Sequence, residues 1–164
     1  MGDTHPPAGT HRNILRWFFR LPATPPSAII PGVARLLLID DDPAVSVTLA
    51  RMLEFCGHQV TRIESAERGL ERAMAAPPDA LILDMKMPEM GGLEFLRRLR
   101  AVASLETLPV GVITGDYFLG EGVLQELTAL GATIRYKPIR IEDLATLTEH
   151  ILGTTPAQAP ENES

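Results

Sequence analysis

LLLIDDDPAV, residues 36–45, joins a continuous aliphatic run to three consecutive aspartates and a proline. An aliphatic run with no polar alternation is typical of a strand that is buried on both faces of a sheet. Pro43 fits the first turn of a helix, and Asp42 can cap that helix by accepting a backbone hydrogen bond. The stretch therefore predicts a buried strand that ends in acidic residues and passes directly into a helix.

The same change from a short apolar run to a segment of helical periodicity recurs along the chain. Strands are predicted at 36–39, 60–63, 80–83, 110–113 and 133–136, and helices around 43–56, 66–76, 93–99, 123–130 and 144–151. Five such units in succession predict an α/β fold in which helices cover both faces of a parallel sheet.

The composition fits one soluble domain with some extra length. The chain has 164 residues, of which 45% are hydrophobic and 5% aromatic, so a mostly aliphatic core is expected. Cys56 is the sole cysteine, which excludes disulfide and cysteine-zinc frameworks. No apolar run approaches the roughly 18 residues of a membrane span, and Arg16 and Arg20 interrupt the one candidate for a signal-peptide core. A cytoplasmic protein without a membrane partner is therefore expected.

Charge and proline divide the chain into three parts. Residues 1–35 contain four arginines, one aspartate and six of the 14 prolines, whereas residues 36–152 contain 18 acidic and 11 basic residues. We predict a disordered, proline-rich extension at 1–34, a folded domain at 35–152 and a disordered tail at 153–164. Because the acidic body has no basic stripe, a direct nucleic-acid partner is not expected.

Polar residues follow the predicted strands at their carboxyl ends, where ligands bind in sheets of this kind. They are Asp40, Asp41, Asp84, Thr114 and Lys137. Three carboxylates at the ends of neighbouring strands repel one another, and Mg²⁺ offsets that repulsion while keeping room for phosphate oxygens. The hydroxyl and the ammonium both suit phosphoryl oxygens. The set predicts a phosphoryl-transfer site in which a carboxylate can be the acceptor.

Plainer interpretations exist for each part of this set. The aspartates at 40–42 can serve as a helix cap alone, and Asp84 can belong to a simple turn. The joint occurrence of all five residues at predicted strand ends favours the phosphoryl-transfer site. Because neither common glycine-rich nucleotide loop occurs in the sequence, the phosphoryl donor is expected to be another protein or a small acyl phosphate.

Residues 35–152 resemble the receiver domain of bacterial two-component response regulators. The matching segments are LLLIDDDPAV at 36–45, LILDMKMPEMGGLEFL at 81–96, VITG at 112–115 and YKP at 136–138. The resemblance implies a flavodoxin-like (βα)5 fold, which is a doubly wound parallel sheet of strand order 2-1-3-4-5. It also implies a phosphoprotein that takes its phosphoryl group from a histidine kinase or a histidine phosphotransfer protein. Such a protein signals by docking a downstream protein, which the sequence does not identify, and is not an enzyme with a separate substrate.

The resemblance also implies a role for each matching site residue. Asp84 is the phosphorylated aspartate and a Mg²⁺ ligand. Asp41 binds Mg²⁺ directly, Asp40 binds it through water, and Lys86 offers its backbone carbonyl. In the implied transfer, Mg²⁺ and Lys137 balance the charge of the transition state.

Two further residues are implied to respond to the phosphoryl group. Thr114 matches the hydroxyl that moves toward the phosphoryl oxygens, and Lys137 matches the lysine that pairs with them. Pro138 matches a proline that is often cis in the family. The movement would bias a surface formed by the fourth helix and the fifth strand, and so change which partner binds.

The sequence departs from the family pattern at the position of the usual switch aromatic, three residues before the lysine. Ile134 occupies it, and Tyr136 lies two residues further on, so strand alternation is expected to point both to the same face. A reduced or altered coupling between phosphorylation and output follows as a hypothesis. The loop Gly115-Asp116-Tyr117-Phe118 adds two aromatic residues that are either partner contacts or local packing.

Lys86 and Asp116 lie two residues beyond the phosphorylation site and the switch threonine respectively. We predict a salt bridge between them that restricts hydrolytic water and lengthens the life of the acyl phosphate. Two solvated charges are the simpler alternative, because surface pairs are usually weak.

Three classes of function remain open from the sequence. A phosphoryl-accepting signalling module, which docks a protein or relays the phosphoryl group, is the first, and a single receiver without an effector domain is expected. A binding module that keeps the fold but works without phosphorylation is the second, supported by Ile134. A phosphatase with an aspartate nucleophile is disfavoured, because it would need a second aspartate where Lys86 stands.

Overall fold

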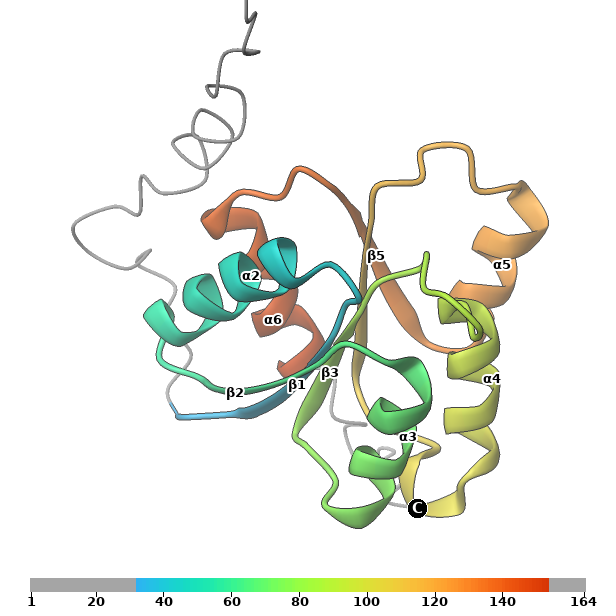
Figure 1. Cartoon of the computed structure of the whole chain (residues 1–164), viewed down its shortest axis with the longest axis horizontal. Coiled ribbons are helices and arrows are strands. Elements are labelled where there is room, and N and C mark those ends of the chain that lie inside the picture. The colour runs from blue at the N-terminus through green and yellow to red at the C-terminus, as the bar shows by residue number, and fades with distance from the viewer. Residues whose placement is uncertain (1–31, 154–164) are drawn as a thin grey trace, which may run out of the picture.

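A five-stranded parallel sheet forms the centre of the protein (Figure 1). Its strands are β1 (Arg35–Ile39), β2 (Gln59–Ile63), β3 (Ala80–Leu83), β4 (Val110–Thr114) and β5 (Ala132–Tyr136). They lie in the order β2-β1-β3-β4-β5, and every neighbouring pair is parallel. The structure, a computed structural model, thereby confirms the flavodoxin-like fold and its strand order.

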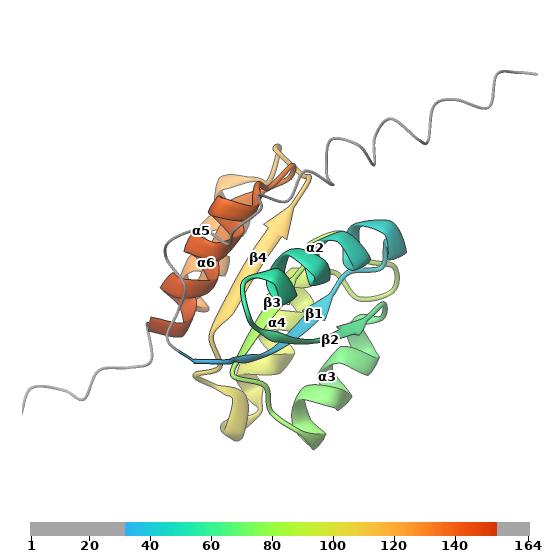
Figure 2. The same ribbon diagram turned by 90° about the vertical axis from the view of Figure 1, so that its left-hand side faces the viewer.

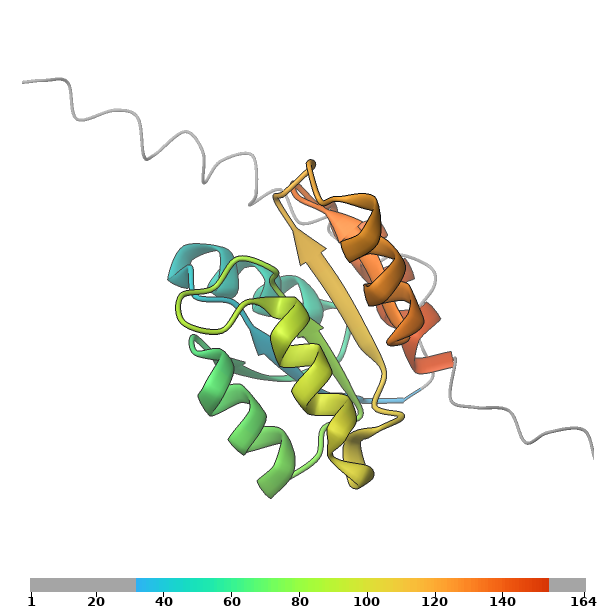
Figure 3. The same cartoon turned by 90° about the vertical axis from the view of Figure 1, so that its right-hand side faces the viewer.

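Helices cover both faces of the sheet, as Figures 2 and 3 show from opposite sides. They are α2 (Pro43–Phe55), α3 (Ala66–Ala75), α4 (Gly92–Ala101), α5 (Glu121–Ala129) and α6 (Ile141–Gly153), with a short 3-10 turn η1 (Ala103–Leu105) after α4. Helices α2 and α6 pack on one face around a cluster that includes Leu38 and Leu147. Helices α3, α4 and α5 pack on the other around Leu83, Phe95 and Leu127. The core is mostly aliphatic, as the composition predicts.

Local signals in the sequence set the start of two helices. Asp42 caps α2, because its Oδ1 atom accepts hydrogen bonds from the backbone N–H groups of Ala44 at 2.9 Å and Val45 at 3.2 Å. Pro43 occupies the first turn, where its missing N–H costs nothing. Ser65 caps α3 in the same way, with its hydroxyl accepting from the Arg68 N–H at 3.4 Å. The predicted cap at Asp42 is confirmed.

The structure describes residues 32–153. The predicted extension at 1–34 and the predicted tail at 153–164 therefore lie almost wholly outside the described residues, and their boundaries stay predictions. Among the residues that are described, no helix combines the length and the hydropathy that crossing a membrane requires.

Glu89 adopts a left-handed backbone conformation, with φ of 66°, in the loop between β3 and α4. A glutamate pays a steric penalty there that asparagine largely avoids. We expect Glu89→Asn to raise the free energy of unfolding by about 0.5–1 kcal/mol, measured by urea denaturation. Glu106→Asn is the matched control, because Glu106 is also exposed but has φ of −55°. Equal effects of the two substitutions would contradict the strain at Glu89.

Candidate functional site

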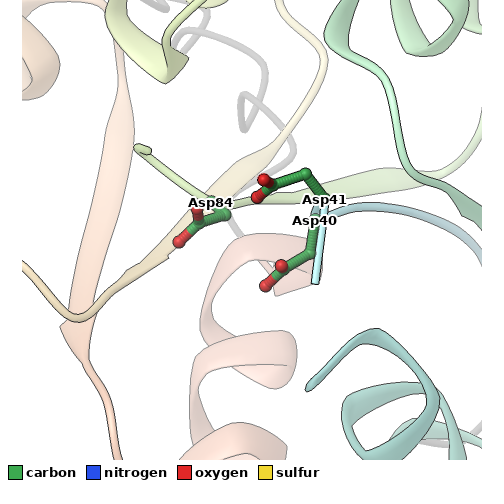
Figure 4. Close-up of side chains that lie close together, drawn as sticks. All are labelled: Asp40, Asp41 and Asp84. Carbon is green, nitrogen blue, oxygen red and sulfur yellow. The ribbon is translucent and has the colours of Figure 1, made fainter. Parts of the chain in front are cut away.

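Three carboxylates converge at the carboxyl ends of β1 and β3 (Figure 4). Asp40 and Asp41 directly follow β1, and Asp84 directly follows β3. One oxygen from each lies within 4.8 Å of the others, with Asp40 and Asp84 buried and Asp41 partly buried. Because the connection from β1 leads to β2 on one side while β3 lies on the other, this is the topological switch point of the sheet.

Lys137 bridges two of these carboxylates. Its Nζ atom donates to Asp40 Oδ2 at 2.9 Å and to Asp84 Oδ1 at 3.0 Å. The other oxygens accept backbone hydrogen bonds, Asp40 Oδ1 from the Asp42 N–H at 3.0 Å and Asp84 Oδ2 from the Lys86 N–H at 3.0 Å. The structure therefore joins residues from the ends of β1, β3 and β5, which are far apart in sequence, in one charged cluster.

Burial and charge shift the pKa values of Asp84 and Lys137. Burial raises the pKa of Asp84, and Asp40 adds to that rise, although the hydrogen bond and charge of Lys137 and the Lys86 N–H act in the opposite direction. Burial by itself lowers the pKa of Lys137, but the hydrogen bonds and charges of Asp40 and Asp84 outweigh it and raise the pKa above its ordinary value. Lys137 is thus a fixed cation at neutral pH, and Asp84 retains an affinity for a further positive group.

The donor set of this site fits Mg²⁺. Three carboxylates face a single ammonium, so the cluster keeps an excess of negative charge that a divalent cation can neutralise. All the side-chain ligands are hard oxygens, and one of the three carboxylates is partly open to solvent. Mg²⁺ prefers such oxygens and retains water at its remaining positions.

Thr114 ends β4 and lies beside Lys137. It is fully buried, its Oγ1 accepts from the Asp116 N–H at 3.1 Å, and its carbonyl accepts from the Lys137 N–H at 2.8 Å. The peptide bond between Lys137 and Pro138 is cis, as the family resemblance implies. The structure thus places the predicted hydroxyl and the predicted lysine on neighbouring strand ends.

The predicted contact between Lys86 and Asp116 is present. Lys86 Nζ lies 3.4 Å from Asp116 Oδ2, and the side chains are 74% and 21% exposed. Asp116 Oδ1 also accepts from the Phe118 N–H at 3.0 Å, which fixes a turn in the loop between β4 and α5. The salt bridge therefore joins the two loops that follow β3 and β4.

The aromatic residues near the site divide between packing and exposure. Tyr117 stacks on Tyr136, with ring centroids 5.3 Å apart and planes 13° apart, whereas Phe118 is 94% exposed. Ile134 instead packs, partly buried, against the apolar cluster beneath α3, α4 and α5. Gly115 is exposed, and a Cβ atom built on it would meet no atom within 4 Å. Of the two interpretations given for the loop aromatics, local packing holds for Tyr117 and not for Phe118.

Sequence reasoning missed this tyrosine stack. Its signal is the strand register, because Tyr136 pairs with Thr114 across β4 and β5, and Tyr117 follows Thr114 by three residues. A loop that turns back after β4 therefore passes over the end of β5. The turn made by Asp116 supplies that reversal.

Comparisons with known proteins agree with this geometry. A family model described as the response regulator receiver domain matches residues 36–149. The response regulator MprA of Mycobacterium ulcerans is 36% identical over 121 residues, which are 74% of this chain and 51% of that protein. MprA of Mycobacterium leprae is also 36% identical, over 74% of this chain and 52% of its own length. The chain spans about half the length of these curated relatives.

Solved structures give the same result for the fold. The chemotaxis response regulator CheY4 of Vibrio cholerae superposes with a TM-score of 0.67 at 26% identity, over 73% of this chain and 99% of its own. A response regulator receiver domain protein from Clostridium thermocellum gives a TM-score of 0.66 at 27% identity, over 74% of this chain and 95% of its own. With the family model, the sheet order and the acidic cluster in agreement, the chain belongs to the response regulator receiver domain family.

Proposed function

We propose that Asp84 accepts a phosphoryl group from a phosphohistidine of a histidine kinase or a histidine phosphotransfer protein. The observation that carries this proposal is the cluster of three carboxylates bridged by Lys137 at the switch point of the sheet. An excess of buried negative charge beside a fixed ammonium suits a reaction that brings phosphoryl oxygens to one carboxylate.

In the transfer, a carboxylate oxygen of Asp84 attacks the phosphorus atom. An oxygen–phosphorus bond forms while the nitrogen–phosphorus bond breaks, and its electron pair stays on the departing histidine nitrogen. Lys137 already contacts Asp84 Oδ1 and is close enough to follow the charge onto the phosphoryl oxygens. Thr114 supplies a hydroxyl at the neighbouring strand end.

Asp41 and Asp84, with Asp40 through water and the carbonyl of Lys86, would hold Mg²⁺ at this cluster. When bound, the ion neutralises the charge that three carboxylates and a phosphoryl group bring together. The Lys86 N–H donates to Asp84 Oδ2 and so fixes the orientation of the Asp84 carboxylate.

We infer that the protein acts in the cytoplasm of a bacterium as a signalling module, with no separate substrate to turn over. Its output would be a protein that docks on it, or onward transfer of the phosphoryl group. Residues 36–152 carry more acidic than basic side chains, which supports a protein partner over a nucleic acid.

The test is incubation with acetyl phosphate and Mg²⁺, followed by intact-protein mass spectrometry. We expect one added phosphoryl group on the wild type and none on Asp84→Asn. Asp42→Asn is the matched control, because Asp42 belongs to the same acidic run but caps α2, and asparagine keeps that role. Absence of the added mass from the wild type would overturn the proposal and favour a binding module that works without phosphorylation, for which Ile134 is the supporting residue.

The salt bridge between Lys86 and Asp116 is expected to prolong the acyl phosphate. Asp116→Asn removes the ion pair but keeps the oxygen that accepts from the Phe118 N–H, so the loop retains its turn. We expect dephosphorylation to accelerate about threefold, in line with the small energy of an exposed pair, and Asp116→Ala to accelerate it at least as much. Decay rates measured by intact mass would check this, and equal rates in wild type and Asp116→Ala would remove the idea.

A further inference from the structure

Both tyrosines of the chain lie together beside the phosphorylation site. The sequence contains two tyrosines, and they form the stacked pair of Tyr117 and Tyr136. Tyr117 belongs to the loop between β4 and α5 and is 59% exposed, while Tyr136 ends β5 and is 38% exposed. Any signal specific to tyrosine therefore reports on this one contact.

The stack is tied to the lysine of the site. The hydroxyl of Tyr117 donates a hydrogen bond to the backbone carbonyl of Lys137. The side chain of the same lysine donates to Asp40 and Asp84, and its backbone follows Tyr136 directly. The residue whose ammonium bridges Asp40 and Asp84 therefore also anchors the tyrosine pair through its backbone.

The stack is also tied to the threonine of the site. Thr114 pairs with Tyr136 in the sheet register, and its carbonyl accepts from the Lys137 N–H. Its hydroxyl accepts from the Asp116 N–H, one residue before Tyr117. The two groups that would bond a phosphoryl oxygen are therefore each connected to the tyrosine pair, Thr114 through the loop and Lys137 through the strand.

We propose that the stack of Tyr117 on Tyr136 is a latch that holds the loop against β5 in the free protein and opens when Asp84 carries a phosphoryl group. The inference rests on the proposed function of Asp84. New bonds to phosphoryl oxygens would shift the Thr114 hydroxyl, which now accepts from the Asp116 N–H of the loop, and the Lys137 ammonium, which now contacts Asp40 and Asp84. A stack of partly exposed rings contributes about as much free energy as one hydrogen bond, so one new bond to a phosphoryl oxygen is enough to shift the equilibrium between the closed and the open loop. Tyr117 and Tyr136 act as positioning residues for the loop and for Lys137.

Opening of the latch would change the surface next to the site. Phe118, almost fully exposed, follows Tyr117 in the loop, so the two aromatic rings move with the same short segment. Release of Tyr117 from Tyr136 would free one face of each ring for a partner. The latch thus connects Asp84 with the surface of the protein without an aromatic residue at position 134, which is Ile134 in this chain.

Beryllofluoride with Mg²⁺, a mimic of the acyl phosphate, provides the test on the full chain. Its binding is followed by fluorine NMR, and the two tyrosine rings are followed independently by NMR after selective labelling, with Tyr117→Phe and Tyr136→Phe to assign them. We expect both ring signals of the wild type to shift as beryllofluoride binds. Bound beryllofluoride with unchanged tyrosine signals would overturn the latch while leaving the proposed function standing. No bound beryllofluoride would overturn both.

Thermodynamic linkage between opening of the latch and binding of beryllofluoride gives a second, quantitative test. If binding opens the latch, removing the latch favours the bound state, so Tyr117→Ala is expected to bind beryllofluoride about fivefold more tightly than the wild type. Tyr117→Phe keeps the stack without the hydroxyl and should fall between the two. Phe118→Ala, which removes a ring from the same loop but not from the stack, should leave the affinity unchanged. A purely structural role would lower thermal stability without tightening binding, and equal or weaker binding by Tyr117→Ala would refute the latch.

Discussion

Lys137→Met is expected to slow phosphorylation of Asp84 by acetyl phosphate about 100-fold at saturating Mg²⁺, the size of effect seen when one donor to a developing oxyanion is removed. Methionine keeps an unbranched apolar stem that reaches the ε position but lacks the ammonium. The variant therefore loses the cation that contacts both Asp40 and Asp84 without losing packing volume. The rate of gain of the phosphorylated mass measures the effect.

The same variant is expected to unfold more easily, and the loss depends on pH. Because the folded-state pKa of Asp84 is raised, ionising this group costs stability as pH rises above the ordinary carboxyl value, about 4. Lys137 limits that cost in the wild type. Without it we expect a loss of about 3 kcal/mol at pH 7, since a buried charge is left without its partner, and a smaller loss near pH 4.

Arg140→Met provides the control for both measurements. It removes one positive charge three residues from Lys137, but the Arg140 side chain is 79% exposed and pairs with Glu142 at 3.6 Å, outside the cluster. We expect little change in phosphorylation rate or stability, because exposed ion pairs contribute little. Similar losses of phosphorylation rate and stability in both variants would show that they depend on the net charge of this region and not on the bridge between Asp40 and Asp84.

The sequence predicts the acidic cluster well because its residues sit at strand ends. Asp40, Asp41 and Asp84 each follow an unbroken aliphatic run, and in a parallel sheet the carboxyl ends of all strands meet at one edge. The contact between Lys86 and Asp116 is predicted by similar reasoning, because Lys86 lies two residues beyond Asp84 and Asp116 lies two residues beyond Thr114. The end of a strand is marked locally by the end of its aliphatic run, so the hydrophobic pattern of the sequence is enough to locate the residues that follow it.

Contacts that depend on how a loop folds back could not be predicted in this way. The stack of Tyr117 on Tyr136 needs the turn set by the Asp116 carboxylate and the Phe118 N–H, which residue spacing alone does not specify. The left-handed conformation of Glu89 is equally hidden, because glutamate gives no local signal for it. In both cases the result depends on the conformation of a loop, which the spacing of residues does not specify.

Gly92→Ala is expected to destabilise the protein by about 2–3 kcal/mol, the range for forcing extra volume into a packed position. Gly92 begins α4, and a Cβ atom there would lie 2.7 Å from the carbonyl oxygen of Asp84 and 2.9 Å from the Met85 sulfur. The first contact is with backbone, which cannot move aside as a flexible side chain can. We therefore also expect phosphorylation to slow about tenfold or more, because the added methyl group displaces the acceptor residue itself.

Gly122→Ala separates this effect from the general response of a helical glycine to alanine. Gly122 lies in the first turn of α5, and a Cβ atom built on it meets nothing within 4 Å. Alanine there should stabilise the helix by about 0.5–1 kcal/mol, opposite in sign to the change at Gly92, and leave phosphorylation unaltered. If urea denaturation showed Gly92→Ala to be as stable as the wild type, the close approach of α4 to Asp84 would not constrain the site. If it destabilised the fold with an unchanged phosphorylation rate, the start of α4 would support the core without positioning the acceptor.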